Sequence, residues 1–479
     1  MPETKHYDQL YIDGAWVPAG GEKSIPVIDP STKQEIATVR SASLSDVDRA
    51  VLAARRAFET FGRTPVEGRI DLLERLLAAY ERRREEFAKT ITAEMGAPIA
   101  LARTAQTALG VGHIQCAIDA LKRLENVERR GTSEIVYEPT GVAALITPWN
   151  WPINQVFTKV ASALAAGCTV VLKPSQITPL DSILFAELVE EVGAPAGVFN
   201  LVFGDGSVVG SHLVRSELVD VVSFTGSTRA GREISRDAAG TIKTVHLELG
   251  GKSPNVILDD ADLERAVETG VQVCFSNAGQ SCSVATRMIV PRALLPQVEQ
   301  IAKRTAESYA VGNPTDEATT MGPVASRRQF ETVQHYIEKG IEEGQTLLTG
   351  GPGAPEGLEH GYYVHPTIFT DVDPNSTIAQ EEIFGPVLVI IAYDTEEEAV
   401  EIANGTIYGL AAVVQSSDGD RARRIASRIR AGHVYINHDA AAYTSVPFGG
   451  WKQSGTGYEH DEWGLRGFQS IKAVLGVGS

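Results

Sequence analysis

One cysteine of the sequence stands in a polar turn, where a thiol is free to act as a nucleophile. Cys282 lies in the segment 277–283, which follows an apolar, helix-like stretch, whereas Cys168 and Cys274 lie in apolar runs typical of inert core cysteines. A lone cysteine is more often inert, so both interpretations stay open at this point. The carboxyl end of a helix disfavours a thiolate, so activation requires a cationic cofactor ring or a nearby base.

Two polar residues near the ends of apolar segments are candidates for acid–base and electrostatic roles. Glu248 stands between two leucines and precedes two glycines. Burial would raise its pKa and suit it to general-base chemistry, although a strand-edge glutamate facing water fits the same pattern. Asn150 follows the apolar run 142–146, where its amide would point into a crevice as an oxyanion donor. The alternative is a turn stiffened by Pro148 and Pro152.

Further segments indicate a nucleotide site. Lys173 ends a second apolar run, where its ammonium group would bind ribose or phosphate, or would be an ordinary surface group. Gly226 and Ser227 open a helix whose backbone amides suit a pyrophosphate, although a plain capped helix has the same residues. The glycine-rich segment 204–210 is one residue too long for the dinucleotide fingerprint and is weak alone.

The elements that must position these residues alternate between strands and helices. The first series has strand candidates at 142–146, 169–172, 198–203 and 219–224, with helices at 156–166 and 179–192. The second has strand candidates at 255–258, 286–290, 387–392, 411–415 and 433–437, with helices at 263–275 and 396–403. A hairpin at 10–17 and helices at 45–61, 69–91 and 101–124 precede both. This alternation predicts an α/β fold with parallel sheets covered on both faces.

Composition narrows the class of protein. The 479 residues are 43% hydrophobic and 22% charged, so disorder is excluded as the main state. The formal net charge of −18 argues against a nucleic-acid partner, because phosphate backbones would be repelled. The four cysteines form no CxxC pattern, so we expect no metal and a reducing, cytoplasmic location. Neither a signal peptide nor a membrane-spanning run is expected.

Seven segments follow one another in a specific order: Pro148-Trp149-Asn150, Lys173-Pro174-Ser175, Phe224-Thr225-Gly226-Ser227, Glu248-Leu249-Gly250-Gly251-Lys252, Gly279-Gln280-Ser281-Cys282, Glu382-Ile383-Phe384-Gly385-Pro386 and Pro447-Phe448-Gly449-Gly450. In this order they resemble the NAD(P)-dependent aldehyde dehydrogenase superfamily, over nearly the whole chain. The resemblance implies a Rossmann-type cofactor domain (1–126 and 140–249), an α/β catalytic domain (250–449) and a small oligomerisation arm with a carboxyl-terminal segment (127–139 and 450–479). An exposed strand edge in such an arm requires a partner, so a homodimer or homotetramer is expected.

The resemblance also implies a reaction, the oxidation of an aldehyde to a carboxylic acid with NAD or NADP. Cys282 would attack the aldehyde carbon, while the Asn150 amide and the Cys282 backbone amide would hold the oxyanion. The thiohemiacetal would pass a hydride to the nicotinamide, and Glu248 would activate the water that hydrolyses the thioester. Lys159 and Glu459 match positions that form a proton relay with this glutamate.

The remaining site residues are also implied by the resemblance. The cofactor contacts are Ile146, Trp149, Lys173, Ser175, Gln176, Gly206, Gly226, Ser227, Leu249, Glu382 and Phe384. The substrate pocket is lined by Trp151, Asn154, Gln155, Thr158, Ser281, Ser283, Ala442 and Phe448. The three alanines at 440–442 predict an open entrance that accepts long or bulky aldehydes.

Two departures from the family pattern, and two alternatives, bear on these expectations. Gln176 stands where many members have a glutamate that repels the 2′-phosphate of NADP, so measurable use of NADP is expected. Tyr458 stands where many members have a basic residue before the relay glutamate, here Glu459. This departure concerns the proton relay and not the main chemistry. A CoA-acylating dehydrogenase generally lacks the hydrolytic glutamate, and Glu248 argues against it. A non-enzymatic binding protein on the same fold would be favoured by loss of Cys282 or Glu248, and both are present.

Overall fold

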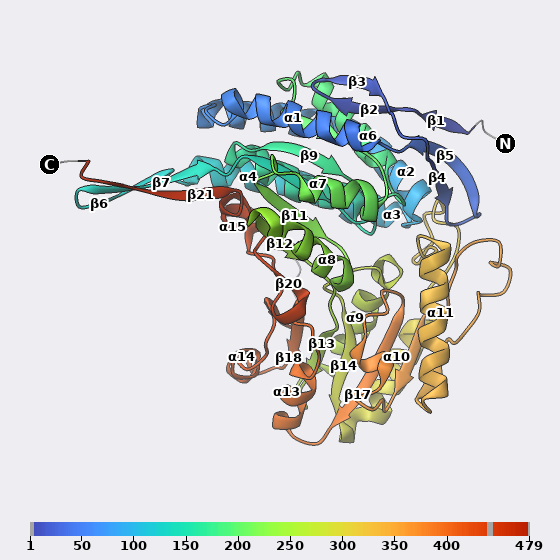
Figure 1. Ribbon diagram of the computed structural model, residues 1–479. Coiled ribbons are helices and arrows are strands. Elements are labelled where there is room, and N and C mark those ends of the chain that lie inside the picture. Colours follow the sequence, from blue (N-terminus) through green and yellow to red (C-terminus); the bar gives the residue numbers. More distant parts are fainter. Residues whose placement is uncertain (1–3, 438–443, 478–479) are drawn as a thin grey trace.

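The computed structural model describes residues 4–437 and 444–477. Two large sheets, each with helices packed against it, form two bodies of the molecule, and a narrow three-stranded sheet extends away from them (Figure 1). Both large sheets are predominantly parallel, and their central strands are buried along their whole length. The predicted α/β fold class is therefore confirmed.

The first large sheet has eight strands in the order β20-β12-β11-β8-β9-β10-β2-β3. Its bounds are β2 (Gln9–Ile12), β3 (Ala15–Pro18), β8 (Val142–Ile146), β9 (Thr169–Lys173), β10 (Phe199–Leu201), β11 (Val221–Thr225), β12 (Thr244–Glu248) and β20 (Gly455–Thr456). Strands β8 to β12 are parallel, whereas the predicted hairpin β2–β3 and the short β20 pair antiparallel at the two edges. The carboxyl ends of the parallel strands, where ligands of such sheets bind, therefore lie together.

Helices pack around this sheet. They are α1 (Leu44–Phe61), α2 (Val66–Met95), α3 (Ile99–Leu101), α4 (Thr107–Arg123), α5 (Pro152–Ala166), α6 (Leu180–Glu191), α7 (Ser211–Arg215), α8 (Thr228–Ala238) and α15 (Asp461–Arg466). A capping box of Ser43 and Asp46 begins α1, and a left-handed Gly167 ends α5. The helix expected at 101–124 is not continuous, because a π-helical turn at Ala102–Gln106 interrupts it.

The second large sheet has seven strands in the order β15-β16-β17-β14-β13-β18-β19. Its strands are β13 (Ser253–Ile257), β14 (Ala285–Pro291), β15 (Thr346–Thr349), β16 (Thr367–Thr370), β17 (Val387–Tyr393), β18 (Ala411–Gln415) and β19 (His433–Ile436). Its helices are α9 (Leu263–Phe275), α10 (Leu295–Glu307), α11 (Arg327–Glu342), α12 (Thr377–Gln380), α13 (Glu396–Asn404) and α14 (Gly419–Ala426). All five strands expected in the second series are present, whereas the edge strand β15 and its neighbour β16 were not expected.

Two small sheets complete the fold. One consists of β1 (Lys5–Tyr7), β4 (Ser24–Asp29) and β5 (Gln34–Arg40), none of which was expected. The other, here called the arm, consists of β6 (Val127–Arg130), β7 (Ser133–Pro139) and β21 (Gln469–Leu475) and projects from the molecule (Figure 1). Its last strand leaves Ile471 70% and Leu475 78% exposed. The division of the chain into domains stays a prediction.

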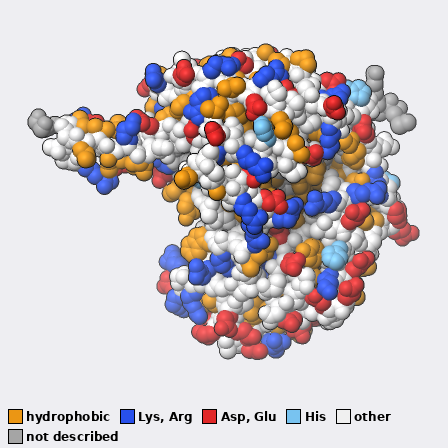
Figure 2. All heavy atoms as spheres, viewed as in Figure 1, with side chains coloured by type: hydrophobic (Ala, Val, Ile, Leu, Met, Phe, Trp, Pro, Cys, Tyr) orange, Lys and Arg blue, Asp and Glu red, His pale blue; other side chains and the backbone are white. Residues whose placement is uncertain are grey.

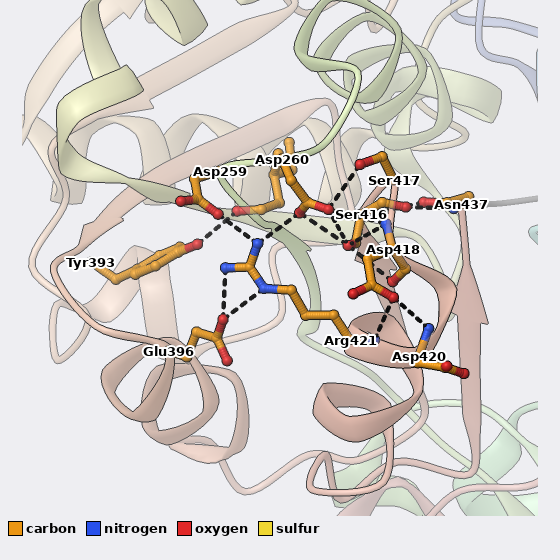
Figure 3. Close-up of polar contacts among 11 residues, drawn as sticks. Asp259, Asp260, Tyr393, Glu396, Ser416, Ser417, Asp418, Asp420, Arg421 and Asn437 are labelled. Carbon is orange, nitrogen blue, oxygen red and sulfur yellow. Dashed lines mark hydrogen bonds and ion pairs between the residues drawn. The ribbon is translucent and has the colours of Figure 1, made fainter.

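A polar network secures the end of β19 to its neighbours (Figure 3). The Asp260 carboxylate accepts hydrogen bonds from the hydroxyls of Ser416 and Ser417 and from Arg421. Asn437 accepts a hydrogen bond from the Ser416 backbone N–H at 2.9 Å and donates one to its carbonyl at 2.8 Å. The network fixes where β19 ends; Ala442, expected to line the substrate entrance, lies outside the described residues.

No helix within the described ranges is long and apolar enough to cross a membrane. The same residues contain no cluster of His, Cys, Asp or Glu suited to holding a metal ion.

Candidate active site

A cleft of about 380 Å³ has walls from the first sheet and from loops of the second. Figure 2 shows Lys and Arg side chains along the waist between the two bodies. The predicted site residues that form walls of the cleft are Trp149, Asn150, Gly226, Ser227, Leu249, Cys282, Glu382 and Phe384. Residues from eight separate positions in the sequence therefore meet in one cavity, at the carboxyl ends of β8, β11 and β12.

The turn that carries Cys282 has an unusual backbone. After α9, residues Asn277, Ala278 and Gly279 all adopt left-handed conformations, with φ of 55°, 53° and 71°. A side chain at position 279 would place its Cβ 2.1 Å from the Gly385 carbonyl oxygen, so only glycine fits there. Such strain persists only where the surroundings enforce it, and here it reverses the chain so that Cys282 faces the cleft.

Buried amides hold this turn against the Asn150 loop. Asn150 donates from Nδ2 to the Gln280 carbonyl at 3.0 Å, and Asn277 donates from Nδ2 to the Asn150 carbonyl at 2.9 Å. Gln106 donates to Asn277 Oδ1 at 3.1 Å, and Gln280 accepts from the Ala325 N–H at 2.9 Å. Sequence reasoning gave no role to Gln106, Asn277 or Gln280. The network aims the Asn150 amide at the turn of Cys282, as an oxyanion donor requires.

The environment of Cys282 opposes ionisation of its thiol. Burial, and then the nearby carboxylates of Glu382 and Glu248, raise the pKa of the Cys282 thiol to about 12. The thiol is therefore protonated at neutral pH in the protein alone. This agrees with the expectation that the helix end does not activate it, so its proton must go to a base.

Glu248 is the last residue of β12 and is 3% exposed. Its Oε2 atom is buried and has no hydrogen-bond partner among the described residues. Burial, and then the charge of Glu459, hold the pKa of Glu248 well above its ordinary value, while Lys159 acts in the opposite direction. The water-facing strand-edge alternative is wrong for this residue. A buried carboxyl group with a raised pKa has the properties of a general base.

Lys159 and Glu459 form a buried ion pair, although 300 residues separate them in the sequence. The Lys159 ammonium also donates to the Ser223 hydroxyl at 3.1 Å. Both charges act on Glu248, so the three groups form one electrostatic unit. Tyr458, which precedes Glu459 and is 47% exposed, does not interrupt this contact.

Glu382 faces the base of the cleft from the loop after α12. Its Oε1 accepts a hydrogen bond from the Gly251 N–H at 3.0 Å. A Cβ at Gly250 would lie 2.1 Å from Glu382 Oε2, so this glycine is needed for the approach. Burial raises the pKa of Glu382 to about 7. Beside it, the rings of Trp149 and Phe384 meet edge to face, with centroids 5.4 Å apart.

The other predicted cofactor residues lie at the strand ends but not in the walls of this cleft. Lys173 ends β9, donates to the Pro174 carbonyl at 2.9 Å, and has its pKa lowered by burial to about 8. Ser175 Oγ accepts from the Ile177 N–H at 3.2 Å. Ile146 ends β8, and Gly206 begins a π-helical turn. By contrast, Ser227 caps α8, as expected, by accepting from the Ala230 N–H at 3.3 Å.

Gln176 has a neighbour that the sequence did not suggest. It lines a second cavity of about 340 Å³, which shares Ser326 and Arg328 with the main cleft. Its side-chain amide hydrogen-bonds to the Asp205 carboxylate, and Lys23 forms a 2.6 Å ion pair with the same carboxylate. These contacts lower the pKa of Asp205, so a negative charge stands next to the neutral Gln176.

The predicted substrate residues on α5 and its start have distinct surroundings. Trp151 donates from Nε1 to the Ser281 hydroxyl at 2.6 Å, which ties the helix start to the cysteine turn. Asn154 Oδ1 contacts the ring of His113. Gln155 and Thr158 each have a buried side-chain oxygen without a hydrogen-bond partner among the described residues. Ser283 is half-buried beside Cys282, and the Phe448 ring packs against His433 and His460.

Comparisons with known proteins agree with this architecture. The model of the aldehyde dehydrogenase family matches residues 16–474. A 3-succinoylsemialdehyde-pyridine dehydrogenase from a Pseudomonas species is 49% identical over 473 residues, which are 98% of this chain and 99% of the relative. The crystal structure of an aldehyde dehydrogenase C mutant from Pseudomonas syringae, complexed with NAD+ and octanal, matches at a TM-score of 0.98 and 48% identity, covering 100% of this chain and 98% of that one. A Mycobacterium tuberculosis aldehyde dehydrogenase complexed with NAD+ matches at a TM-score of 0.96 and 40% identity, covering 99% of both chains. This chain belongs to the aldehyde dehydrogenase family.

Proposed function

We propose that this protein oxidises an aldehyde to the carboxylic acid with NAD+ or NADP+, through a thioester on Cys282. The observation that carries the proposal is the meeting of three groups: a thiol facing the cleft, the amide of Asn150 held against its turn, and the buried carboxyl group of Glu248. These are the nucleophile, the oxyanion donor and the base that the reaction needs.

The residues present fit a nicotinamide dinucleotide. The capped start of α8 offers free backbone N–H groups for a pyrophosphate, and Lys173 and Glu382 would bind the two riboses. Phe384 and Trp149 would pack beside the nicotinamide. When bound, the oxidised dinucleotide supplies the hydride acceptor for the reaction. The relatives solved with NAD+ support this choice of cofactor.

The side chains then act in sequence on the aldehyde. The Cys282 thiol gives its proton to a base in the cleft, and its sulfur attacks the aldehyde carbon. The Asn150 amide and the Cys282 backbone N–H stabilise the oxyanion of the thiohemiacetal. After oxidation to the thioester, Glu248 takes a proton from water, whose oxygen attacks the acyl carbon and releases the acid and the thiol. We propose that Glu248 passes its protons on toward the Glu459 carboxylate of the buried Lys159–Glu459 pair, whose charges act on Glu248.

Glu248, as a buried base, favours hydrolysis of the thioester over its transfer to coenzyme A. The intact nucleophile and base also disfavour a purely binding role. We further propose that the arm pairs with another subunit, because β21 leaves Ile471 and Leu475 exposed.

The substrate that we propose is a medium- or long-chain apolar aldehyde, and octanal in the Pseudomonas syringae relative supports it. The test is NADH formation from octanal and NAD+ by the purified protein. We expect steady production of octanoate, and we expect the Cys282→Ala variant, which lacks the nucleophile, to be inactive. Octanal oxidation by the variant at the rate of the unaltered protein would refute the proposal.

The surroundings of Gln176 lead to a prediction about cofactor selectivity. The ionised Asp205 places next to Gln176 the negative charge that a glutamate at position 176 would have supplied. This charge repels the 2′-phosphate of NADP+, so NAD+ should be preferred and NADP+ used only weakly. We expect Asp205→Asn to lower the ratio of kcat/KM for NAD+ to that for NADP+ about tenfold, roughly 1.4 kcal/mol. Steady-state kinetics with both cofactors measure this ratio. The control variant Lys23→Met removes the positive charge paired with Asp205 and should not lower the ratio of kcat/KM for NAD+ to that for NADP+. An unchanged ratio in Asp205→Asn would contradict the prediction.

A further inference from the structure

Arg328 is a cationic side chain in the wall of the cleft, and no described residue neutralises it. It is the second residue of α11, after the capping residue Ser326 and Arg327. Among the described residues, no hydrogen bond or ion pair joins its guanidinium group to another residue. The other arginine of the wall, Arg229, forms a 2.8 Å ion pair with Glu233. The charge of Arg328 is therefore available to a ligand in the cleft.

The position of Arg328 is unfavourable for the helix itself. The free N–H groups at the start of a helix carry a partial positive charge, which favours carboxylates there and disfavours cations. Helices α9 and α13 follow this rule, with Glu264 and with three glutamates in their first turns. The first turn of α11 instead has no acidic residue and begins with two arginines. An anion bound at this place would offset the repulsion.

Arg328 also lies between the two ends of the path that a dinucleotide would follow. Gln176, on the side of the adenosine ribose, lines the second cavity, and Glu382, on the side of the nicotinamide, lines the main cleft. Arg328 and Ser326 line both cavities, so they stand between the two riboses. The group that joins the two riboses of a dinucleotide is the pyrophosphate, which is negatively charged. The start of α8, where we place the pyrophosphate, forms another wall of the same cleft.

We propose that Arg328 binds the pyrophosphate of the dinucleotide, together with the backbone N–H groups at the start of α8. This role rests on the proposed function, in which the cleft holds the cofactor. It adds an ionic contact from the second body of the molecule to the amides of the first (Figure 1). A guanidinium group suits the task, because its planar N–H donors can bind two phosphate oxygens at once. Arg328 positions the cofactor and takes no part in the transfer of protons or hydride.

The test is calorimetric binding of ADP-ribose, which carries the pyrophosphate and both riboses but no nicotinamide, to the purified protein. We expect Arg328→Met to raise the Kd about tenfold, as for loss of a hydrogen bond to a charged group. Arg328→Lys keeps the charge but not the planar donors and should give an intermediate Kd. Arg327→Met is the matched control, because Arg327 lines the second cavity but not the cleft. Its Kd should change by less than about twofold, since exposed charges at a distance are screened.

Kinetics and stability separate this role from a structural one. With octanal as substrate, Arg328→Met should raise KM for NAD+ more than it changes kcat, because saturating NAD+ compensates for weaker binding. Without ligand, its Tm should equal or exceed that of the unaltered protein, since a cation is removed from the start of a helix. ADP-ribose at equal concentration should then raise the Tm of Arg328→Met less than that of the unaltered protein.

The binding results decide the role of Arg328 separately from the proposed reaction. Equal Kd values for Arg328→Met and the unaltered protein would overturn the role of Arg328, even if octanal is oxidised. No binding of ADP-ribose to the unaltered protein would overturn it as well. Equal weakening by Arg327→Met would show that general positive charge, and not a contact of Arg328, attracts the nucleotide. By contrast, an Arg328-dependent Kd in a protein that does not oxidise octanal would support the pyrophosphate contact and refute the proposed reaction.

Discussion

Glu248→Gln is expected to produce one equivalent of NADH per active site and then to stop. The amide cannot take a proton from water, so the thioester on Cys282 would form and persist. We expect the steady rate with octanal to fall about 10²- to 10⁴-fold, the range for loss of a positioned general base. Among the described residues the buried Glu248 Oε2 has no hydrogen-bond partner, so this atom is free to bind the water.

Rapid-mixing absorbance would measure the burst, and mass spectrometry of the quenched protein would locate an octanoyl group on Cys282. Glu381→Gln is a matched control: Glu381 is an exposed neighbour of the site whose carboxylate accepts from the Tyr336 hydroxyl, and turnover should persist. Normal turnover of Glu248→Gln would contradict the assignment. Loss of the burst together with the turnover would show that Glu248 also deprotonates the thiol.

The central strands and the main chemical groups could be predicted because their signals are local. The apolar run that became β8 is buried at every position, and Cys282 differs from Cys168 and Cys274 in the few residues around it. The edges of the fold gave weaker signals. β4 and β5 alternate buried and exposed residues, as in Ser24 to Val27, and this period of two would have identified them.

What could not be predicted depends on contacts between distant segments. Gln106 and Asn277 are 171 residues apart, and nothing near Gln106 in the sequence indicates that its amide supports the cysteine turn. The charge of Asp205 next to Gln176 arises from folding, so the sequence pattern alone suggested a neutral site. The Lys159–Glu459 pair was accessible only through resemblance, since nothing near either residue in the sequence indicates the other as its partner.

Lys159→Met is expected to destabilise the protein and to shift its pH–rate profile. The Lys159 side chain is 0% and that of Glu459 8% exposed, so the variant leaves a buried carboxylate without its counter-charge. Breaking such a pair from one side costs about 3–5 kcal/mol in the free energy of unfolding. Glu248 is affected as well: Lys159 lowers its pKa and Glu459 raises it, so loss of the lysine raises the pKa of Glu248 further. The rate requires the deprotonated base, so the rising limb of the kcat profile should move to higher pH.

The double variant Lys159→Met/Glu459→Gln separates charge from packing. It removes both charges, so the free energy of unfolding should recover most of the loss, and the rising limb should move back toward its position in the unaltered protein. Denaturant unfolding and kcat between pH 5 and 10 on all three proteins would measure both effects, over a range of about five pH units that brackets the raised pKa of a buried carboxyl group. If the single and double variants are equally destabilised, the loss is one of packing. If their pH profiles also coincide with that of the unaltered protein, the pair does not control the charge of Glu248, and a proton path from Glu248 through Lys159 is excluded.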